Sequence, residues 1–387
     1  MIKTLAVQGY RSLRDVVIGF GNLTVITGAN GTGKSNLYRA IRLLADAGRG
    51  ELIGSLARAG GLDSVRWAGP ETVSATMRGG RAPIQGTRRT GPVRLRLGVS
   101  GDGFGYAVDL GLPTPAEAGR FPLDPRIKAE AIWSGPLLRP AATLIDRAGG
   151  LARTREGRSW AQLSSSLGGS DSVLAELAGA SPEIGALRER LRDWRCYDQL
   201  RTDPGAPARA ERIATRTPIL AHDGSDVAAA LATIEEIGDA AQLARTIAEA
   251  FDGSELEFGD SGAGLSLRLR QPGMLRPLTA AELSDGTLRY LILVAALLTP
   301  RPPELLVLNE PESSLHPDLY PSLARLIVAA ARSTQVIIVS HAADLVQRIE
   351  RAEADDLVRI ELIKEFGETV INGQGRLDRP AWNWPSR

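Results

Sequence analysis

The chain has 387 residues, of which 43% are hydrophobic and 24% are charged, and its formal net charge is +1. A chain of this length and apolar content can bury a large core, which excludes a wholly disordered protein. Its longest strongly apolar stretch, residues 290–298, is far below the roughly 18 residues that a membrane span needs, and the near-zero net charge gives no global attraction to nucleic acid.

Three short apolar runs open the chain and predict β-strands at residues 2–8, 16–20 and 23–27. The third run leads directly into a glycine-rich loop. After this loop, apolar residues recur at helical spacing. We therefore expect the loop to join a strand to a helix.

The loop reads Gly28-Ala29-Asn30-Gly31-Thr32-Gly33-Lys34-Ser35 and matches the phosphate-loop pattern in full. Glycines let backbone N–H groups point at phosphates, and the amino terminus of the next helix adds a positive end. The pattern predicts ATP and Mg²⁺ as ligands, with Lys34 on the outer phosphates and the Ser35 hydroxyl on the metal. The alternative is a glycine-rich turn without a ligand, which the strand and helix on either side disfavour. The predicted nucleotide contacts are Gly28, Asn30, Gly31, Gly33, Lys34, Ser35 and Asn36.

Residues 72–101 contain arginines but no acidic residue, which makes them the best local footprint for a polyanion. A hairpin that only faces solvent is an equally open alternative. Alternating apolar and polar residues over residues 72–112 predict an antiparallel β arm. The predicted nucleic-acid contacts are Arg78, Arg81, Arg88 and Arg89, and the same segment holds Arg94 and Arg96.

Residues 113–273 are irregular, with helices predicted near residues 181–195 and over residues 226–251. A group of four residues is interpreted as a solvated, salt-bridged helix end, with a substrate-facing patch as the open alternative: Arg195, Tyr197, Arg201 and Asp203. We read the whole segment as an inserted lobe, mainly helical or mixed. The predicted division is a first half with the β arm (residues 1–112), the lobe (113–273) and a second half (274–387), with the two halves forming one α/β core.

The second half alternates predicted helices at residues 281–298 and 317–331 with strands at residues 305–308 and 335–340. Both strands are continuous apolar runs, as expected for a parallel sheet that is covered on both faces. Polar residues follow them, and ligands collect at the carboxyl ends of such strands. Glu310 is the expected general base for an attacking water, and His341 is expected near the outer phosphate, although a lone histidine is often structural.

These motifs, together with Leu283-Ser284-Asp285-Gly286 and Ser313-Ser314-Leu315-His316-Pro317, occur in the order found in ABC-type ATPases, which the chain resembles. Ser284 alone would read as an ordinary helix cap. Gly9-Tyr10-Arg11-Ser12-Leu13, the loop through Asn36, and Asn309-Glu310-Pro311-Glu312 resemble more narrowly the RecF, SMC and OLD branch, often described as AAA family. This resemblance covers roughly residues 1–60 and 280–345.

The resemblance implies a P-loop NTPase of the ABC-ATPase head type that forms a homodimer around ATP. Lys34 and Ser35 of one copy would hold the nucleotide, and Ser284, Asp285 and Gly286 of the other would cap it. Arg11 would lie near the nucleotide, and His341 would sense the γ-phosphate.

One position departs from the pattern of the family. Its members usually carry aspartate where this chain has Asn309, which would support Mg²⁺ with Ser35. Without that charge we expect slow hydrolysis. The glutamine that usually completes the Mg²⁺ shell is not assigned from the sequence, and Gln85 is one candidate for it.

Three functions remain open. The first is an ATPase that acts on double-stranded DNA, in DNA repair or in antiviral defence. The second is an ATP-switched scaffold that holds or releases a separate effector such as a nuclease. The third, a transporter subunit, is disfavoured by Arg11-Ser12 and the long lobe. A single cysteine, Cys196, favours a reducing cytoplasm, and we expect no membrane partner.

Overall fold

The computed structural model describes residues 1–72, 74–78, 91–114, 119–198, 200–213, 215–260, 264–352, 356–375 and 377–387. They form two compact units. The first unit comprises Met1–Phe20, Thr27–Asp193 and Ile360–Arg387, and the second comprises Gly21–Ile26 and Trp194–Arg359. These units follow other boundaries than residues 112 and 273, so the three-part division stays a prediction.

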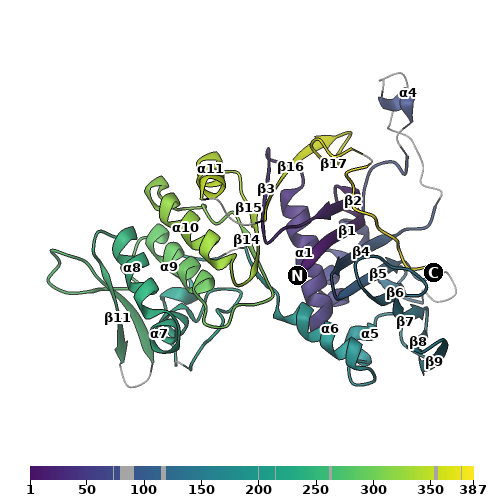
Figure 1. The fold of residues 1–387 in the computed structure, drawn as a ribbon, viewed down its shortest axis with the longest axis horizontal. Helices are drawn as coiled ribbons and strands as arrows, with labels where there is room; N and C mark the ends of the chain where they lie inside the picture. The colour runs from purple at the N-terminus through teal and green to yellow at the C-terminus, as the bar shows by residue number, and fades with distance from the viewer. Residues whose placement is uncertain are drawn as a thin grey trace. The chain divides into compact units, whose positions relative to one another are not determined.

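The first unit is built on an antiparallel sheet with the strand order β2-β1-β4-β5-β6-β7-β8-β9 (Figure 1). Strands β1 and β2 lie where the sequence predicts them. The strands expected in a β arm are β4 and β5, and they are central members of this sheet, because β4 pairs with β1 and β5 pairs with β6. The strands are β1 (Ile2–Tyr10), β2 (Leu13–Gly19), β4 (Leu95–Gly101), β5 (Phe104–Gly111), β6 (Arg126–Ser134), β7 (Thr143–Ala148), β8 (Leu151–Glu156) and β9 (Ser159–Ser164).

Helix α1 (Lys34–Arg49) packs against β1 and β4 and against helix α6 (Pro182–Asp193). The two helices approach closely at Gly48, where an added Cβ would lie 2.6 Å from the Leu191 Cβ. The other elements of this unit are short. The short helices are α2 (Leu52–Arg58), α3 (Gly61–Val65), α4 (Ala75–Arg78) and α5 (Val173–Glu176). Strands β16 (Leu357–Glu365) and β17 (Glu368–Ile371) form a hairpin, and this unit includes β16 from Ile360 onward.

A buried ion pair joins β6 and β7. The side chains of Glu130 and Arg147 are 1% and 0% exposed, and they pair at 2.7 Å. Glu130 also accepts hydrogen bonds from the Tyr106 hydroxyl (2.8 Å), the Ser172 hydroxyl (2.7 Å) and the Val173 N–H (2.9 Å). Burial and the adjacent Glu130 carboxylate raise the pKa of Tyr106 well above its ordinary value. This network ties three strands to the start of α5.

The second unit contains a parallel sheet in the order β10-β14-β15-β3. Strand β3 (Leu23–Gly28) belongs to this unit through Ile26 and continues into the first unit at Thr27. The inner residues of β14 and β15 are fully buried, as continuous apolar runs predict. The other strands of this sheet are β10 (Arg195–Tyr197), β14 (Leu305–Asn309) and β15 (Gln335–Val339).

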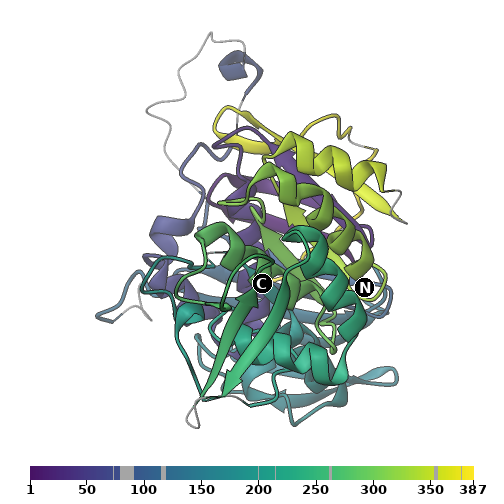
Figure 2. The ribbon, with the colours of Figure 1, turned by 90° about the vertical axis from the view of Figure 1, so that its left-hand side faces the viewer.

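Helices and a small sheet complete the second unit. Residues 226–251, predicted as one helix, form α7 and α8, because the chain breaks at Gly238 and Asp239 then caps α8 by accepting the Gln242 N–H. Figure 2 shows the long hairpin of β11 and β12, which contacts α8 and α7. The helices are η1 (Pro207–Arg209), α7 (Val227–Ile237), α8 (Ala240–Ala250), α9 (Asp285–Leu297), η2 (Pro317–Leu319), α10 (Tyr320–Ala330) and α11 (Ala343–Arg351), and the small sheet is β11 (Glu255–Asp260), β12 (Leu265–Arg270) and β13 (Leu278–Thr279).

Among the described residues, none of the helices combines the length and the apolar character that a membrane crossing requires.

Candidate nucleotide-binding site

The glycine-rich loop lies in the first unit, between the end of β3 and the start of α1. Gly28, Gly31 and Gly33 have φ angles of 148°, 81° and 107°, which residues with a side chain rarely adopt. The Lys34 ammonium donates to the carbonyls of Gly28 (2.6 Å) and Ala29 (3.1 Å). Because α1 has no side-chain cap and no acidic residue in its first turn, its amino-terminal N–H groups suit an anion.

Two residues distant in sequence support this loop. The Thr369 hydroxyl on β17 donates to the Thr32 carbonyl at 2.6 Å and lies 2.7 Å from the Ser12 hydroxyl. An alanine Cβ at Gly33 would lie only 2.0 Å from the Thr369 hydroxyl oxygen.

Among the predicted nucleotide contacts, the side-chain amide of Asn36 donates to the Ser12 hydroxyl at 2.8 Å. Asn30 and Ser35 are exposed.

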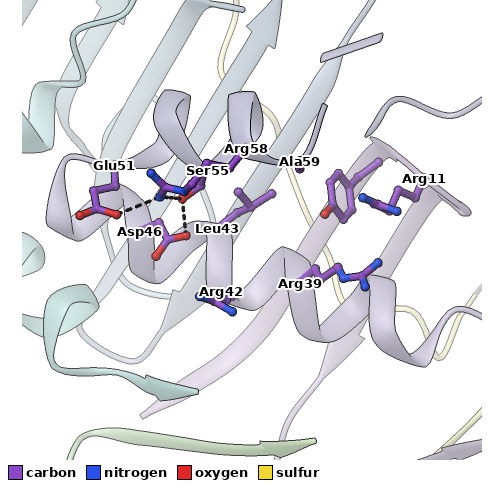
Figure 3. A pocket seen from close by; sticks show the side chains of 10 residues that line it. Arg11, Arg39, Arg42, Leu43, Asp46, Glu51, Ser55, Arg58 and Ala59 are labelled. Atoms are coloured by element: carbon purple, nitrogen blue, oxygen red, sulfur yellow. Dashed lines mark hydrogen bonds and ion pairs between the residues drawn. The ribbon is translucent and has the colours of Figure 1, made fainter. Parts of the chain in front are cut away.

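Arg11, predicted to lie near the nucleotide, lines a pocket of about 560 Å³ along α1 and α2 (Figure 3). Its φ of 48° is unusual for a residue with a side chain, and its backbone N–H donates to the Val65 carbonyl at 2.7 Å. The guanidinium lies 5.8 Å from the centre of the Tyr10 ring. Arg39 and Arg42 of α1 line the same pocket.

The pocket carries uncompensated positive charge. Its two acidic residues are already engaged, because Glu51 pairs with Arg58 at 3.0 Å and Asp46 pairs with Arg49 at 3.2 Å. None of the described carboxylates pairs with the arginines Arg11, Arg39 and Arg42, and the buried Arg11 Nε has no hydrogen-bond partner there. Burial raises the pKa of Tyr10, and Arg11 and Arg39 oppose that rise. An anionic ligand would supply the missing charge.

In the second unit, the predicted catalytic residues meet at the carboxyl ends of β14 and β15. Glu310 follows β14 with a φ of 48°, and its N–H donates to the Val339 carbonyl at 2.7 Å. The His341 Nδ1 lies 3.8 Å from the Glu310 Oε1, and the two side chains are 51% and 39% exposed. Their proximity suits a reacting group at this edge, while their catalytic roles stay predictions.

Glu312 organises this edge, a role that the sequence analysis missed. Its side chain is 3% exposed, and its Oε1 accepts from the Ser340 hydroxyl (2.7 Å), the His341 N–H (2.9 Å) and the Ala342 N–H (3.2 Å). The same oxygen lies 3.2 Å from the His341 Nδ1. Glu312 therefore fixes the turn that carries His341.

Asn309, the predicted metal-supporting residue, is hydrogen-bonded to a neighbouring strand. Its Nδ2 donates to the Asp198 Oδ1 at 2.7 Å. The helix predicted near residues 181–195 is present as α6. The interpretation of the segment from Arg195 to Asp203 as a solvated helix end was wrong, because Arg195–Tyr197 form strand β10 parallel to β14. The surface ion pair expected in that segment does form, between Arg201 and Asp203 at 2.7 Å.

The signature-like segment opens helix α9. The Ser284 hydroxyl accepts from the Thr287 N–H at 3.1 Å, so it caps the helix, and both Ser284 and Asp285 are exposed. An added Cβ at Gly286 would lie 2.7 Å from the Ser314 carbonyl oxygen, which explains a glycine at this close approach.

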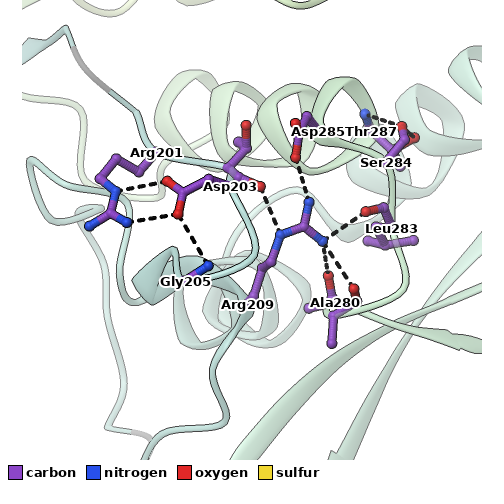
Figure 4. A network of polar contacts seen from close by, with 11 residues as sticks. Arg201, Asp203, Gly205, Arg209, Ala280, Leu283, Ser284, Asp285 and Thr287 are labelled. Carbon is purple, nitrogen blue, oxygen red and sulfur yellow. Dashed lines mark hydrogen bonds and ion pairs between the residues drawn. The ribbon is translucent and has the colours of Figure 1, made fainter.

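Two arginines that the sequence analysis missed hold this segment. The nearly buried Arg209 donates to the carbonyls of Ala280 (2.8 Å) and Leu283 (2.7 Å) and pairs with Asp285 at 2.7 Å (Figure 4). Arg289, on α9 itself, donates to the Leu200 carbonyl at 3.1 Å and the Glu310 carbonyl at 3.0 Å. No local pattern identifies either residue, because their partners lie elsewhere in the chain and most of them are backbone carbonyls.

The predicted nucleic-acid contacts remain untested. Arg81, Arg88 and Arg89, like Gln85, lie outside the described residues, and Arg78 is described only as the last residue of α4. Arg96 of the same segment pairs with Asp109 at 2.9 Å and shares that carboxylate with Arg387.

The described residues contain no group of three or more His, Cys, Asp or Glu that could hold a metal ion. Magnesium in nucleotide sites needs only one or two protein oxygens besides phosphates and waters. Ser35 in the phosphate loop supplies one such oxygen. In the second unit, the Asn309 Oδ1 is buried and has no hydrogen-bond partner among the described residues. Each unit therefore presents an oxygen of a kind that Mg²⁺ accepts.

Comparisons with known proteins place the chain in a family. A model described as AAA domain, putative AbiEii toxin, Type IV TA system matches residues 137–346, and a model described as AAA ATPase domain matches residues 1–53. No curated protein matches the chain. Similar solved structures include the SMC head domain from Thermotoga maritima, which is 17% identical with a TM-score of 0.44 over 96% of this chain and 97% of that one. Another is the Smc head domain with an extended coiled coil bound to the C-terminal domain of ScpA, derived from Pyrococcus furiosus, which is 14% identical with a TM-score of 0.46 over 96% and 95%. Because the first model covers more than half of the 387 residues, the chain belongs to this family of AAA domains and is a P-loop protein of the ATPase class.

Proposed function

We propose that the chain binds and hydrolyses Mg-ATP and that two copies pair head to head around the nucleotide. The observation that carries this proposal is the phosphate loop. Its three glycines have positive φ angles that residues with a side chain rarely adopt. The Lys34 ammonium donates to the Gly28 and Ala29 carbonyls, which it can exchange for phosphate oxygens.

The second unit would supply the chemistry. Strand β3 belongs to that unit through Ile26, two residues before the loop begins at Gly28. We propose that Glu310 accepts a proton from the attacking water, that His341 contacts the γ-phosphate, and that Ser35 and Asn309 hold Mg²⁺. When bound, Mg²⁺ would neutralise charge that develops on the phosphates.

The signature-like segment would act across the dimer. Ser284 and Asp285 are exposed at the amino terminus of α9, and Arg209 fixes the backbone before them. An exposed, rigid helix terminus suits the phosphates of a nucleotide that is held by a second copy. Ser284, Asp285 and Gly286 of one copy would thus cap the ATP of the other.

The test is ATP turnover against a Lys34→Ala control. We expect the wild-type chain to release phosphate from Mg-ATP, and Lys34→Ala to lose roughly ten- to hundredfold in ATP affinity, because a charge-assisted contact to phosphate is removed. Lys364→Ala, which changes an exposed lysine on β16, should behave as wild type. Wild-type turnover no greater than that of Lys34→Ala, with nucleotide still bound, would contradict hydrolysis and leave a binding-only switch.

We further propose that ATP binding is coupled to duplex DNA, in repair or in defence against foreign DNA. Arg39 and Arg42 on α1 support this, because guanidinium groups without carboxylate partners among the described residues attract phosphates. Exchange of Arg39 and Arg42 for glutamate should weaken duplex binding. The slope of log affinity against log salt concentration should become shallower by about two units, because about two phosphate contacts are lost.

Fluorescence anisotropy over a range of salt concentrations measures this effect. Arg158→Glu, which changes an exposed arginine between β8 and β9, is the matched control and should leave DNA affinity unchanged. DNA binding that is absent, or insensitive to salt with and without ATP, would contradict the DNA proposal.

That outcome would favour a second candidate, an ATP-switched scaffold for a separate effector. The description of the matching family, which names a toxin and a Type IV TA system, supports this candidate. A protein that co-purifies with the chain and leaves when ATP is added would identify the effector.

A further inference from the structure

Asn309 and Asp198 form a pair at the ends of two adjacent parallel strands in the second unit. Strand β10 pairs with β14 so that Tyr197 lies opposite Leu308. Asp198 directly follows β10, and Asn309 is the last residue of β14. The Asn309 Nδ2 donates to the Asp198 Oδ1 at 2.7 Å. Strand register places the two side chains together.

This hydrogen bond sets the direction of the Asn309 amide. A carboxylate only accepts hydrogen bonds, so Asp198 takes the NH₂ end and turns the amide oxygen away. That oxygen, Oδ1, is buried and has no hydrogen-bond partner among the described residues. Buried acceptors are nearly always satisfied, so an orphaned one indicates a missing donor, water or cation.

The surroundings of the pair are negative. Burial lowers the pKa of Arg289, and the nearby carboxylates of Glu312, Asp198 and Glu310 oppose that shift. Three carboxylates thus lie near one guanidinium, which donates hydrogen bonds to the Leu200 and Glu310 carbonyls. A divalent cation would balance this charge.

We propose that Asp198 supplies the carboxylate charge for Mg²⁺ that Asn309 lacks, and that the Asn309 oxygen and Asp198 act as one unit toward the metal. Carboxylate and amide oxygens are ligands that Mg²⁺ accepts, directly or through its waters. The carboxylate then lies next to β10, at Asp198, instead of at position 309 on β14. Asn309 is therefore compatible with a site that binds the metal. The inference rests on the proposed function, because the metal binds with ATP.

The test exchanges the two side chains and measures metal affinity with Mn²⁺ by electron paramagnetic resonance, in the presence of a non-hydrolysable ATP analogue. Asp198→Asn should lower Mn²⁺ affinity roughly ten- to hundredfold, because a charged ligand is lost. Nucleotide affinity in EDTA should not change. The double variant Asp198→Asn/Asn309→Asp keeps one amide and one carboxylate in the pair and should restore Mn²⁺ affinity.

Asp203→Asn is the matched control, because Asp203 follows nearby but pairs with Arg201 at the surface. Unchanged Mn²⁺ affinity in Asp198→Asn would overturn the inference, and so would a folded double variant without restored affinity. If Asp198→Asn alone is unstable, the Mn²⁺ affinity of the double variant still tests the inference, because wild-type affinity supports it and lost affinity overturns it. A wild-type chain that binds no ATP analogue would overturn the proposed function as well. If the analogue binds but Mn²⁺ affinity is the same in Asp198→Asn as in the wild type, this inference alone is overturned.

Discussion

Replacing Glu310 by glutamine is expected to lower ATP turnover by roughly 10²- to 10⁴-fold while nucleotide binding persists. Glutamine keeps the shape of the side chain but cannot accept the proton of the attacking water. The backbone at this position is held independently, because the Glu310 N–H donates to Val339 and its carbonyl accepts from Arg289. Phosphate release and equilibrium nucleotide binding measure the two properties separately.

The same variant tests the head-to-head dimer. Because hydrolysis would release the pair, Glu310→Gln with Mg-ATP should double in mass in solution, as measured by light scattering. Without nucleotide, Glu310→Gln should have the same mass in solution as the wild-type chain without nucleotide. Glu235→Gln, which changes an exposed glutamate at the end of α7, should show normal turnover and no trapped dimer. A mass that does not respond to Mg-ATP would refute pairing around the nucleotide.

Replacing Glu130 by alanine is expected to destabilise the first unit by about 3–5 kcal/mol, because the buried Arg147 charge would lose its partner. The hydroxyls of Tyr106 and Ser172 would lose their acceptor as well. Urea unfolding followed by circular dichroism measures the free energy of unfolding.

Glu156→Ala is the control for this experiment, since Glu156 is exposed at the end of β8, and its effect should stay within about 0.5 kcal/mol. A loss below about 1 kcal/mol in Glu130→Ala would mean that the buried pair contributes little.

Local patterns in the sequence predicted the phosphate loop, helix α1 and the buried strands β14 and β15, because each shows a full period of apolar residues or a complete motif. Strand β10 was missed because three residues are too few to show a period. The break between α7 and α8 was missed because Ala-rich helical spacing continues across Gly238.

The polar residues that organise the sites were harder to predict for another reason. Glu130 and Arg147 look like surface residues in sequence, and only the pairing of β6 with β7 brings them together and buries them. Asp198 and Glu312 act on residues of neighbouring strands, so their roles depend on strand order and register. No spacing along the chain encodes those distances.

The contact between Arg289 and Glu310 has a consequence for timing. Ser284 begins the helix that carries Arg289, and the Arg289 side chain is bonded to the main chain of Glu310. A shift of this helix must therefore either carry the Glu310 carbonyl with it or break that bond. In the proposed dimer, ATP held by one copy would bind at Ser284 of the other copy, at the start of this helix. Arg289 would transmit the resulting shift to Glu310, so that hydrolysis in each copy would depend on ATP bound to its partner.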